Sequence, residues 1–348
     1  MNKRILPEGD IEMRIAIEDK RTRASPTINK LITHFEMSNV ADGKSPRTIT
    51  WYRDILKLFS RYLKENKHTN RIEEFNIDNA RNYVLYLRSR NKFARYTNTH
   101  VQHSGLSPQT IRGHIRGLKA FSSWLYREQY TEENKLQYLK IPKAPVKLIE
   151  PLTDQEINTI TSSINQDSPT GFRNHAIFIT ALDNGLRASE LTDIAISQLD
   201  LKSGYVKVMG KGSKERIVPV GDFVRMTLWN YLNRIRPEPA STECDKLFLS
   251  PSGRPITANT IKLVFSRLSK SSGVERLHAH LCRHTFAINY LLNGGDIFSL
   301  KEILGHTTLD MVNHYLHFTR SQLTAQHHKY SPMDKLQKEQ MVSKGKRQ

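Results

Sequence analysis

Apolar residues recur at helical spacing in the first third of the chain. From Pro46 and again from Pro108 they fall three or four positions apart, with basic side chains between them. Both segments open with serine followed by proline, the pair typical of an N-cap and a first helical position, and Ser25 and Pro26 repeat it. With a further helix predicted over residues 77–87, this pattern predicts a four-helix domain over residues 25–140.

A change in composition separates this domain from the rest of the chain. The prolines and lysines of residues 141–151 favour an extended linker. Thr153 and Glu156 then have the spacing of a capping box, which predicts a helix start. Helical patterning returns over residues 172–186.

A short antiparallel sheet is predicted within the second domain. Residues 205–209 and 216–220 alternate between apolar and polar side chains or are β-branched. A Gly-Lys-Gly-Ser-Lys turn separates the two segments, which predicts a β-hairpin. We therefore expect a mainly α protein of two domains, with the second over residues 152–330. A weakly patterned arm over residues 1–24 and a basic tail over residues 331–348 complete the expected organisation.

The charge of the chain indicates a polyanionic partner. Its 53 Lys and Arg residues against 34 Asp and Glu residues give a net charge of +19. Nucleic acid is favoured, because counterion release rewards many contacts between cations and phosphates; the alternative is a merely soluble basic protein. A membrane-surface role is disfavoured, since the charges spread over whole helices and no long apolar run occurs.

Cysteine usage and the N-terminus bear on location. Cys244 and Cys282 lie far apart, which implies neither a disulfide framework nor a zinc–cysteine site. The first residues are briefly basic, but acidic residues follow instead of an apolar signal core. We expect a cytoplasmic protein that is associated with the nucleoid when bound to DNA.

Six polar residues of the second domain can together attack a phosphodiester. The arginines can hold phosphate oxygens through charge-assisted hydrogen bonds, the tyrosine is a nucleophile, and the lysine and histidines can move protons. In chain order the six are Arg187, Lys211, His280, Arg283, His306 and Tyr315.

Three of these residues also have an ordinary structural interpretation. Arg187 follows Gly185, an expected helix end, and Glu190 three residues on can orient it, as in a surface salt bridge. Lys211 at a hairpin tip is usually a solvated turn residue, and its glycines lack the spacing of a phosphate loop. Tyr315 in an apolar stripe is usually a core residue. Only the combination indicates catalysis.

A zinc site is disfavoured. His280 and His284 lie four residues apart, but the glutamate of a His-Glu-x-x-His motif is missing and no nearby cysteine completes a ligand set. Cys282 is expected to be a small buried side chain and His284 to cap or pack. We expect no metal and no other cofactor.

Five runs of residues resemble the tyrosine recombinase or phage integrase family, in its Xer-like or transposon-borne branch. They are Asn-Gly-Leu-Arg-Ala-Ser-Glu-Leu at 184–191, the hairpin at 208–220, His-Leu-Cys-Arg-His at 280–284, and Leu-Gly-His at 304–306 followed by Tyr-Leu-His at 315–317. The resemblance covers roughly residues 26–330. Cys282 departs from it, because a larger apolar residue is common there, and this should affect packing only.

The resemblance implies a fold and a reaction. The fold would be a helical core-binding (SAM-like) domain and an α-rich catalytic domain that close on DNA as a C-shaped clamp. Arg187 and Arg283 would hold the scissile phosphate, and His306 would hydrogen-bond it. Tyr315 would attack to give a 3′-phosphotyrosyl link, while Lys211 protonates the leaving 5′-oxygen. His280 would be a general acid or base.

The implied partner is double-stranded DNA with paired recombination sites, cut by a homotetramer in a synaptic complex during integration, excision or transposition. Relaxation of DNA in the manner of a type IB topoisomerase remains an alternative. A catalytically silent DNA-binding protein is another, against which the full set of six residues argues. The expected DNA contacts of the first domain are Arg47, Thr48, Arg53, Arg112, Arg116 and Lys119.

Overall fold

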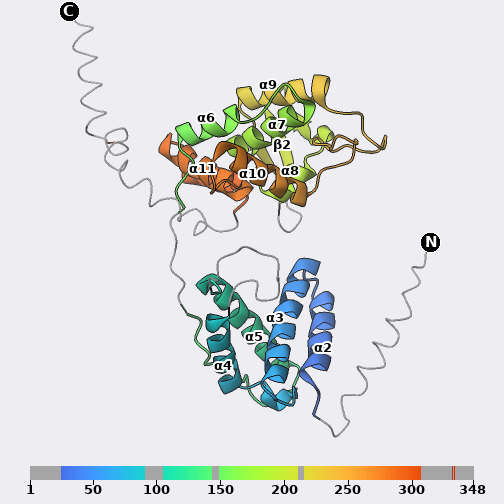
Figure 1. Ribbon diagram of the computed structural model, residues 1–348, viewed down its shortest axis with the longest axis vertical. Coiled ribbons are helices and arrows are strands. Elements are labelled where there is room, and N and C mark those ends of the chain that lie inside the picture. The colour runs from blue at the N-terminus through green and yellow to red at the C-terminus, as the bar shows by residue number, and fades with distance from the viewer. Residues whose placement is uncertain are drawn as a thin grey trace, which may run out of the picture. The chain divides into compact units, whose positions relative to one another are not determined.

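The computed structural model describes residues 25–90, 105–142, 149–210, 215–306, 331 and 333 (Figure 1). The chain divides into two compact units, Met1–Lys147 and Leu148–Gln348. Each has its own hydrophobic core.

The first unit is a bundle of helices around an aromatic core. Its helices are α2 (Ile28–Ala41), α3 (Pro46–Glu65), α4 (Ile77–Ser89) and α5 (Pro108–Arg127), with a 3₁₀ turn at Ile72–Glu74. Helix α3 packs against α2, α4 and α5. Gly117 permits the close approach of α5 to α3, because a Cβ at this position would lie 3.0 Å from Ile55. Phe59 and Phe121 are among the fully buried aromatic rings.

Two of the three predicted serine caps are confirmed. The Ser45 and Ser107 side chains accept the backbone N–H groups of Thr48 and Thr110 at the starts of α3 and α5. The cap predicted at residue 25 is wrong, because α2 begins three residues later with Thr27 as its N-cap.

The backbone before α2 is extended because it pairs with a distant segment. Ile28 N donates to Asn70 O at 2.9 Å, and Ile72 N donates to Pro26 O at 3.1 Å. These bonds hold Pro26 outside the helix. The Ser-Pro signal is therefore overridden by a tertiary contact.

The second unit combines helices with a small sheet. Its helices are α6 (Asp154–Ser162), α7 (Pro169–Asn184), α8 (Ala188–Asp193), α9 (Asp222–Asn230), continued by a π-helical turn (Tyr231–Ile235), α10 (Ala258–Ser272), α11 (Ala279–Leu292) and α12 (Ile297–Leu304), with a 3₁₀ turn at Ile196–Gln198. The strands are β1 (Leu199–Asp200), β2 (Tyr205–Met209) and β3 (Glu215–Pro219). Within the described residues they form an antiparallel sheet in the order β1-β2-β3. The predicted hairpin is confirmed, with Val206 opposite Val218.

The start of this unit is tied to α11. The predicted capping box is present, with Thr153 N donating to the Glu156 carboxylate at 2.8 Å and Glu156 N donating to Thr153 Oγ1 at 3.2 Å. Leu152 N donates to Thr285 Oγ1 of α11 at 2.9 Å. Helix α11 in turn packs along α7, and α12 packs against β3.

The observed architecture confirms the predicted fold class of a mainly α protein with a small antiparallel sheet. Among the described residues, no helix combines the length and the apolar character needed to cross a membrane.

Candidate active site

Gly185 determines where the chain leaves α7. Its φ of +59° is left-handed, as predicted for a helix end, and a Cβ here would lie 2.5 Å from Phe286 and 2.8 Å from Leu304. Only glycine allows the backbone to turn this close to α11 and α12. Two residues later, Arg187 is the N-cap of α8.

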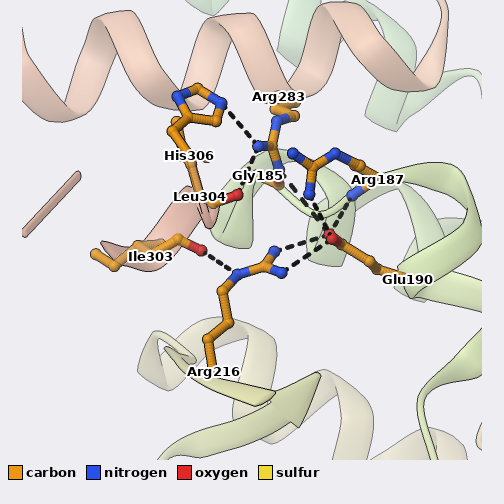
Figure 2. Close-up of polar contacts among 8 residues, drawn as sticks. All are labelled: Gly185, Arg187, Glu190, Arg216, Arg283, Ile303, Leu304 and His306. Atoms are coloured by element: carbon orange, nitrogen blue, oxygen red, sulfur yellow. Dashed lines mark hydrogen bonds and ion pairs between the residues drawn. The ribbon is translucent and has the colours of Figure 1, made fainter. Parts of the chain in front are cut away.

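Glu190 orients Arg187, as the sequence predicted. Its carboxylate accepts the Arg187 backbone N–H at 2.8 Å and the Arg187 Nη1 at 2.7 Å (Figure 2). Glu190 is only 5% exposed, whereas the Arg187 side chain is 32% exposed. The guanidinium is therefore held at one end and reaches the surface at the other.

Arg216 of β3 is a site residue that the sequence analysis missed. Its Nη1 and Nη2 donate to the two oxygens of Glu190 at 2.9 and 2.8 Å, and its Nε donates to the Ile303 carbonyl at 2.8 Å (Figure 2). One signal was present in the sequence. Arg216 lies two residues before the buried Val218, so a cation occupies the inward-facing row of an alternating strand.

Burial is the largest influence on the pKa of Glu190 and acts to raise it. The hydrogen bonds from Arg216 and Arg187, together with the charge of Arg216, outweigh burial and lower the pKa to about 2. Glu190 is therefore an anion at every pH at which the protein would function.

Arg283 of α11 joins three parts of the unit. It is 1% exposed, and its Nη1 donates to Gly185 O at 2.7 Å. Its Nη2 donates to Leu304 O at 2.7 Å and lies 2.9 Å from His306 Nε2 (Figure 2). Because a guanidinium can only donate, His306 Nε2 is the acceptor. The ends of α7 and α12 thus meet on one cation.

His306 is a neutral imidazole in this setting. It is 8% exposed; burial first, and then the charges of Arg283, Arg187 and Arg216, lower its pKa to about 4. With Nε2 accepting from Arg283, the ring proton lies on Nδ1, which has no partner among the described residues. This buried N–H is the donor of His306 that stays unused within the described residues.

Replacing His306 with glutamine should flatten the dependence of stability on pH. Below about pH 6.5 the unfolded chain protonates this histidine while the folded protein does not until about pH 4. Wild type therefore loses stability as pH falls through that window, by roughly 3 kcal/mol from this residue. Urea unfolding at pH 7 and pH 4.5 measures the loss. Equal losses in His306→Gln and wild type would contradict the neutral assignment.

His280 lies at the start of α11 and is exposed, unlike Arg283. Its ring contacts that of His284, with centroids 4.5 Å apart and planes at 78°. Partial desolvation, followed by the charge of Arg283, lowers the pKa of His280. The lowered pKa favours the neutral imidazole, which can accept a proton. The buried side chain predicted for Cys282 is confirmed.

The structure brings together Arg187, Arg283 and His306, with Glu190 and Arg216 linking their elements (Figure 2). Lys211 and Tyr315 lie outside the described residues. The Glu190 carboxylate faces three guanidinium groups, so the cluster keeps an excess of positive charge. That excess suits it to hold an oxyanion such as a phosphate.

The expected DNA contacts of the first unit differ in their surroundings. Arg47 and Arg116 are exposed, and Thr48 lies in the first turn of α3. Arg53 is 3.7 Å from Glu36, and Arg112 has a buried Nε with no partner among the described residues.

Lys119 differs from the expectation. Its Nζ donates to the carbonyls of Leu136, Gln137 and Leu139 at 2.9, 2.7 and 3.0 Å. All three ammonium protons are used to hold the segment after α5. We therefore assign Lys119 a structural role and not a contact with DNA.

Known proteins have sequences similar to that of this chain. The model of the phage integrase family matches residues 150–322. Tyrosine recombinase XerC of Bacillus subtilis (strain 168) is 32% identical over 285 residues, which cover 78% of this chain and 94% of that protein. Tyrosine recombinase XerC of Staphylococcus carnosus (strain TM300) is 31% identical over 280 residues, covering 80% of this chain and 89% of that protein.

Solved structures share the fold. The Tn1549 transposon integrase in complex with a circular intermediate DNA superposes with a TM-score of 0.66 at 20% identity, covering 88% of this chain and all of that one (100%). The XerH site-specific recombinase bound to a palindromic difH substrate gives a TM-score of 0.65 at 20% identity, covering 94% of this chain and 91% of that one.

Proposed function

Because the chain belongs to the phage integrase family and is a tyrosine-type site-specific recombinase, we propose that it cuts and rejoins DNA through a 3′-phosphotyrosyl link to Tyr315. The observation that carries this proposal is the cluster in which Arg187, Arg283 and His306 converge around the buried Glu190 (Figure 2).

In the proposed reaction Arg187 and Arg283 bind the scissile phosphate. Their charge stabilises the crowded anionic transition state, and the Nδ1–H of His306 donates to the same group. An environment fixed in advance is effective here, since no reorganisation is needed when charge develops. The buried bonds of Arg283 to two carbonyls supply that rigidity.

Cleavage and joining are the same step run in opposite directions. Tyr315 Oη forms a bond to phosphorus as the bond to the 5′-oxygen breaks, and that oxygen takes a proton from Lys211. Joining reverses this: a 5′-hydroxyl from another strand attacks, and the tyrosine leaves. One phosphoester replaces another, so the bond energy is conserved and ATP is not required. His280 is the proposed general acid or base for the tyrosine proton.

The proposed assembly is a homotetramer that holds two paired DNA sites. Two alternatives predict different products. A topoisomerase-like enzyme relaxes supercoiled plasmid without recombining sites, and a silent DNA-binding protein does neither. A supercoiled plasmid that carries two copies of the binding site, assayed in parallel for relaxation and for excision of the intervening segment, distinguishes these outcomes. Relaxation without excision would overturn the proposed recombination of paired sites in favour of topoisomerase-like activity.

Integration, excision or transposition of a mobile element is the proposed biological setting. The resemblance of the sequence motifs to the transposon-borne branch of the family supports it, and a chromosomal role is the alternative. Sequencing across the DNA that flanks the gene distinguishes a mobile element from a chromosomal role. Circular junctions that depend on Tyr315 would support a mobile element. Their absence in cells that express the active protein would refute it.

DNA binding by the first unit should depend on Arg47, Arg112 and Arg116. Neutralising all three to glutamine removes up to three phosphate contacts, each worth a slope of about 0.9 in a plot of log affinity against log salt. We expect weaker binding and a slope smaller by up to about 2.7. Arg81→Gln on α4, where Arg81 is ion-paired to Asp78, is the control and should leave the slope unchanged. An unchanged slope in the triple variant would mean that these cations face solvent.

A further inference from the structure

Arg216 has the contacts of a residue that assembles the catalytic cluster. Its guanidinium uses Nη1 and Nη2 on Glu190 and Nε on the carbonyl of Ile303 in the last turn of α12. The side chain is only 9% exposed. One rigid group therefore joins β3, α8 and α12, which lie far apart in the sequence (Figure 2).

The Glu190 carboxylate is fixed by four hydrogen bonds. One oxygen accepts Arg187 Nη1 and Arg216 Nη1, and the other accepts Arg187 N and Arg216 Nη2. The carboxylate cannot rotate without breaking a bond to Arg216. The direction of the Arg187 guanidinium, which bonds the same oxygen, is therefore set by Arg216.

Gly305 brings Arg216 against the turn that carries His306. Its φ of +62° ends α12, and a Cβ here would lie 3.0 Å from Arg216 Cδ. The Arg216 side chain thus passes directly beside the residue that precedes His306. The bond from Arg216 Nε to the Ile303 carbonyl also holds this turn.

We propose that Arg216 is a positioning residue for strand cleavage, which sets Arg187 through Glu190 and His306 through the end of α12. This inference rests on the proposed function. Arg216 contacts no reacting atom in this scheme. It acts on the transition state by fixing the donors that do, and a misplacement of about 1 Å can slow a reaction roughly 100-fold.

The geometry requires arginine and not only a positive charge. A planar guanidinium can donate to both carboxylate oxygens and to a carbonyl at once. The ammonium of lysine is a point charge on a flexible stem and cannot form this fork. Arg216→Lys therefore keeps the charge of the cluster and removes its geometry.

Arg225 offers a matched control in the same unit. Its guanidinium also joins distant parts of the fold, donating to the carbonyls of Leu201 and Lys202 at 2.9 and 3.0 Å and to Asp222 at 2.7 Å. These contacts involve none of the residues around Glu190. Arg225→Lys thus reports the cost of losing an arginine bridge that does not touch the catalytic cluster.

The test measures covalent adduct formation in a single turnover at saturating site DNA, with a 5′-bridging phosphorothioate that traps the adduct. We expect Arg216→Lys to be about 100-fold slower than wild type, with the DNA Kd within about threefold and a cooperative melting transition. Arg225→Lys should keep the wild-type rate. Every assay is run below the melting temperature of the least stable variant, and Arg216→Gln replaces Arg216→Lys if the latter does not fold.

A double-mutant cycle separates positioning from general destabilisation. If Arg216 acts partly through Glu190, adding Arg216→Lys to Glu190→Gln should cost less than about tenfold, the part that acts through the end of α12, whereas independent effects would multiply to the full loss. A rate for Arg216→Lys equal to that of wild type, or a full 100-fold loss in the Glu190→Gln background, would overturn the inference. If wild type itself forms no adduct, the proposed function fails instead.

Discussion

Tyr315→Phe should form no covalent adduct with DNA while it binds the recombination site as tightly as wild type. The substitution removes one oxygen, the atom proposed to attack phosphorus, and keeps the ring. The contacts proposed between the duplex and the cations of this chain do not involve that oxygen. The expected effect is therefore a complete loss of chemistry with no loss of affinity.

Denaturing gels of protein mixed with labelled site DNA measure the adduct, and gel shifts measure the affinity. Tyr290→Phe is a suitable control, because Tyr290 lies on α11 of the same unit and its ring packs on Phe286 with centroids 5.7 Å apart. It should react at the wild-type rate. An adduct that survives denaturation in Tyr315→Phe would place the nucleophile at another residue.

Local signals in the sequence predicted much of the fold. The Ser45 and Ser107 caps, the capping box at Thr153 and the helix end at Gly185 depend on neighbouring residues, and the structure confirms them. The same holds for the link between Arg187 and Glu190, which are three residues apart. Such contacts can be predicted from the sequence because both partners lie within one turn of a helix.

Features that depend on distant contacts could not be predicted. Extended pairing of residues 26–28 with residues 70–72 overrides the Ser-Pro signal before α2. Lys119 looks like a DNA-facing cation on an amphipathic helix, yet three carbonyls that follow α5 use its protons. Arg216 meets Glu190 across 26 residues of sequence, so no local pattern shows the pair.

The burial, hydrogen bonds and protonation of the cluster also depend on contacts that form only in the folded protein. The motif assigned Arg283 and His306 to a phosphate, but it could not show that Arg283 is buried or that it donates to His306 Nε2. That hydrogen bond places the imidazole proton on Nδ1, and burial keeps the ring neutral. Within the described residues, the donors of the site are thus fixed by the convergence of α7, α11 and α12.

Arg187→Ala should slow strand cleavage by roughly 1,000-fold, because removing one donor to a transition-state oxyanion typically costs 100- to 1,000-fold and here a full charge is lost too. The affinity for DNA should fall only modestly, since one cation among many contacts the duplex. The fold should survive, since Glu190 keeps both bonds from Arg216 and does not become an unpaired buried charge.

Single-turnover cleavage at saturating DNA isolates the chemical step from binding. Arg236→Ala is the control for loss of an arginine: Arg236 donates to the carbonyls of Leu247 and Lys246, away from Glu190, and its loss should affect melting but not the cleavage rate. Arg187→Lys should recover only part of the lost rate, because a lysine retains charge without the fork that binds Glu190 and a phosphate together. Cleavage by Arg187→Ala within tenfold of wild type would show that Arg187 is a structural ion pair, and the phosphate would then need another cation.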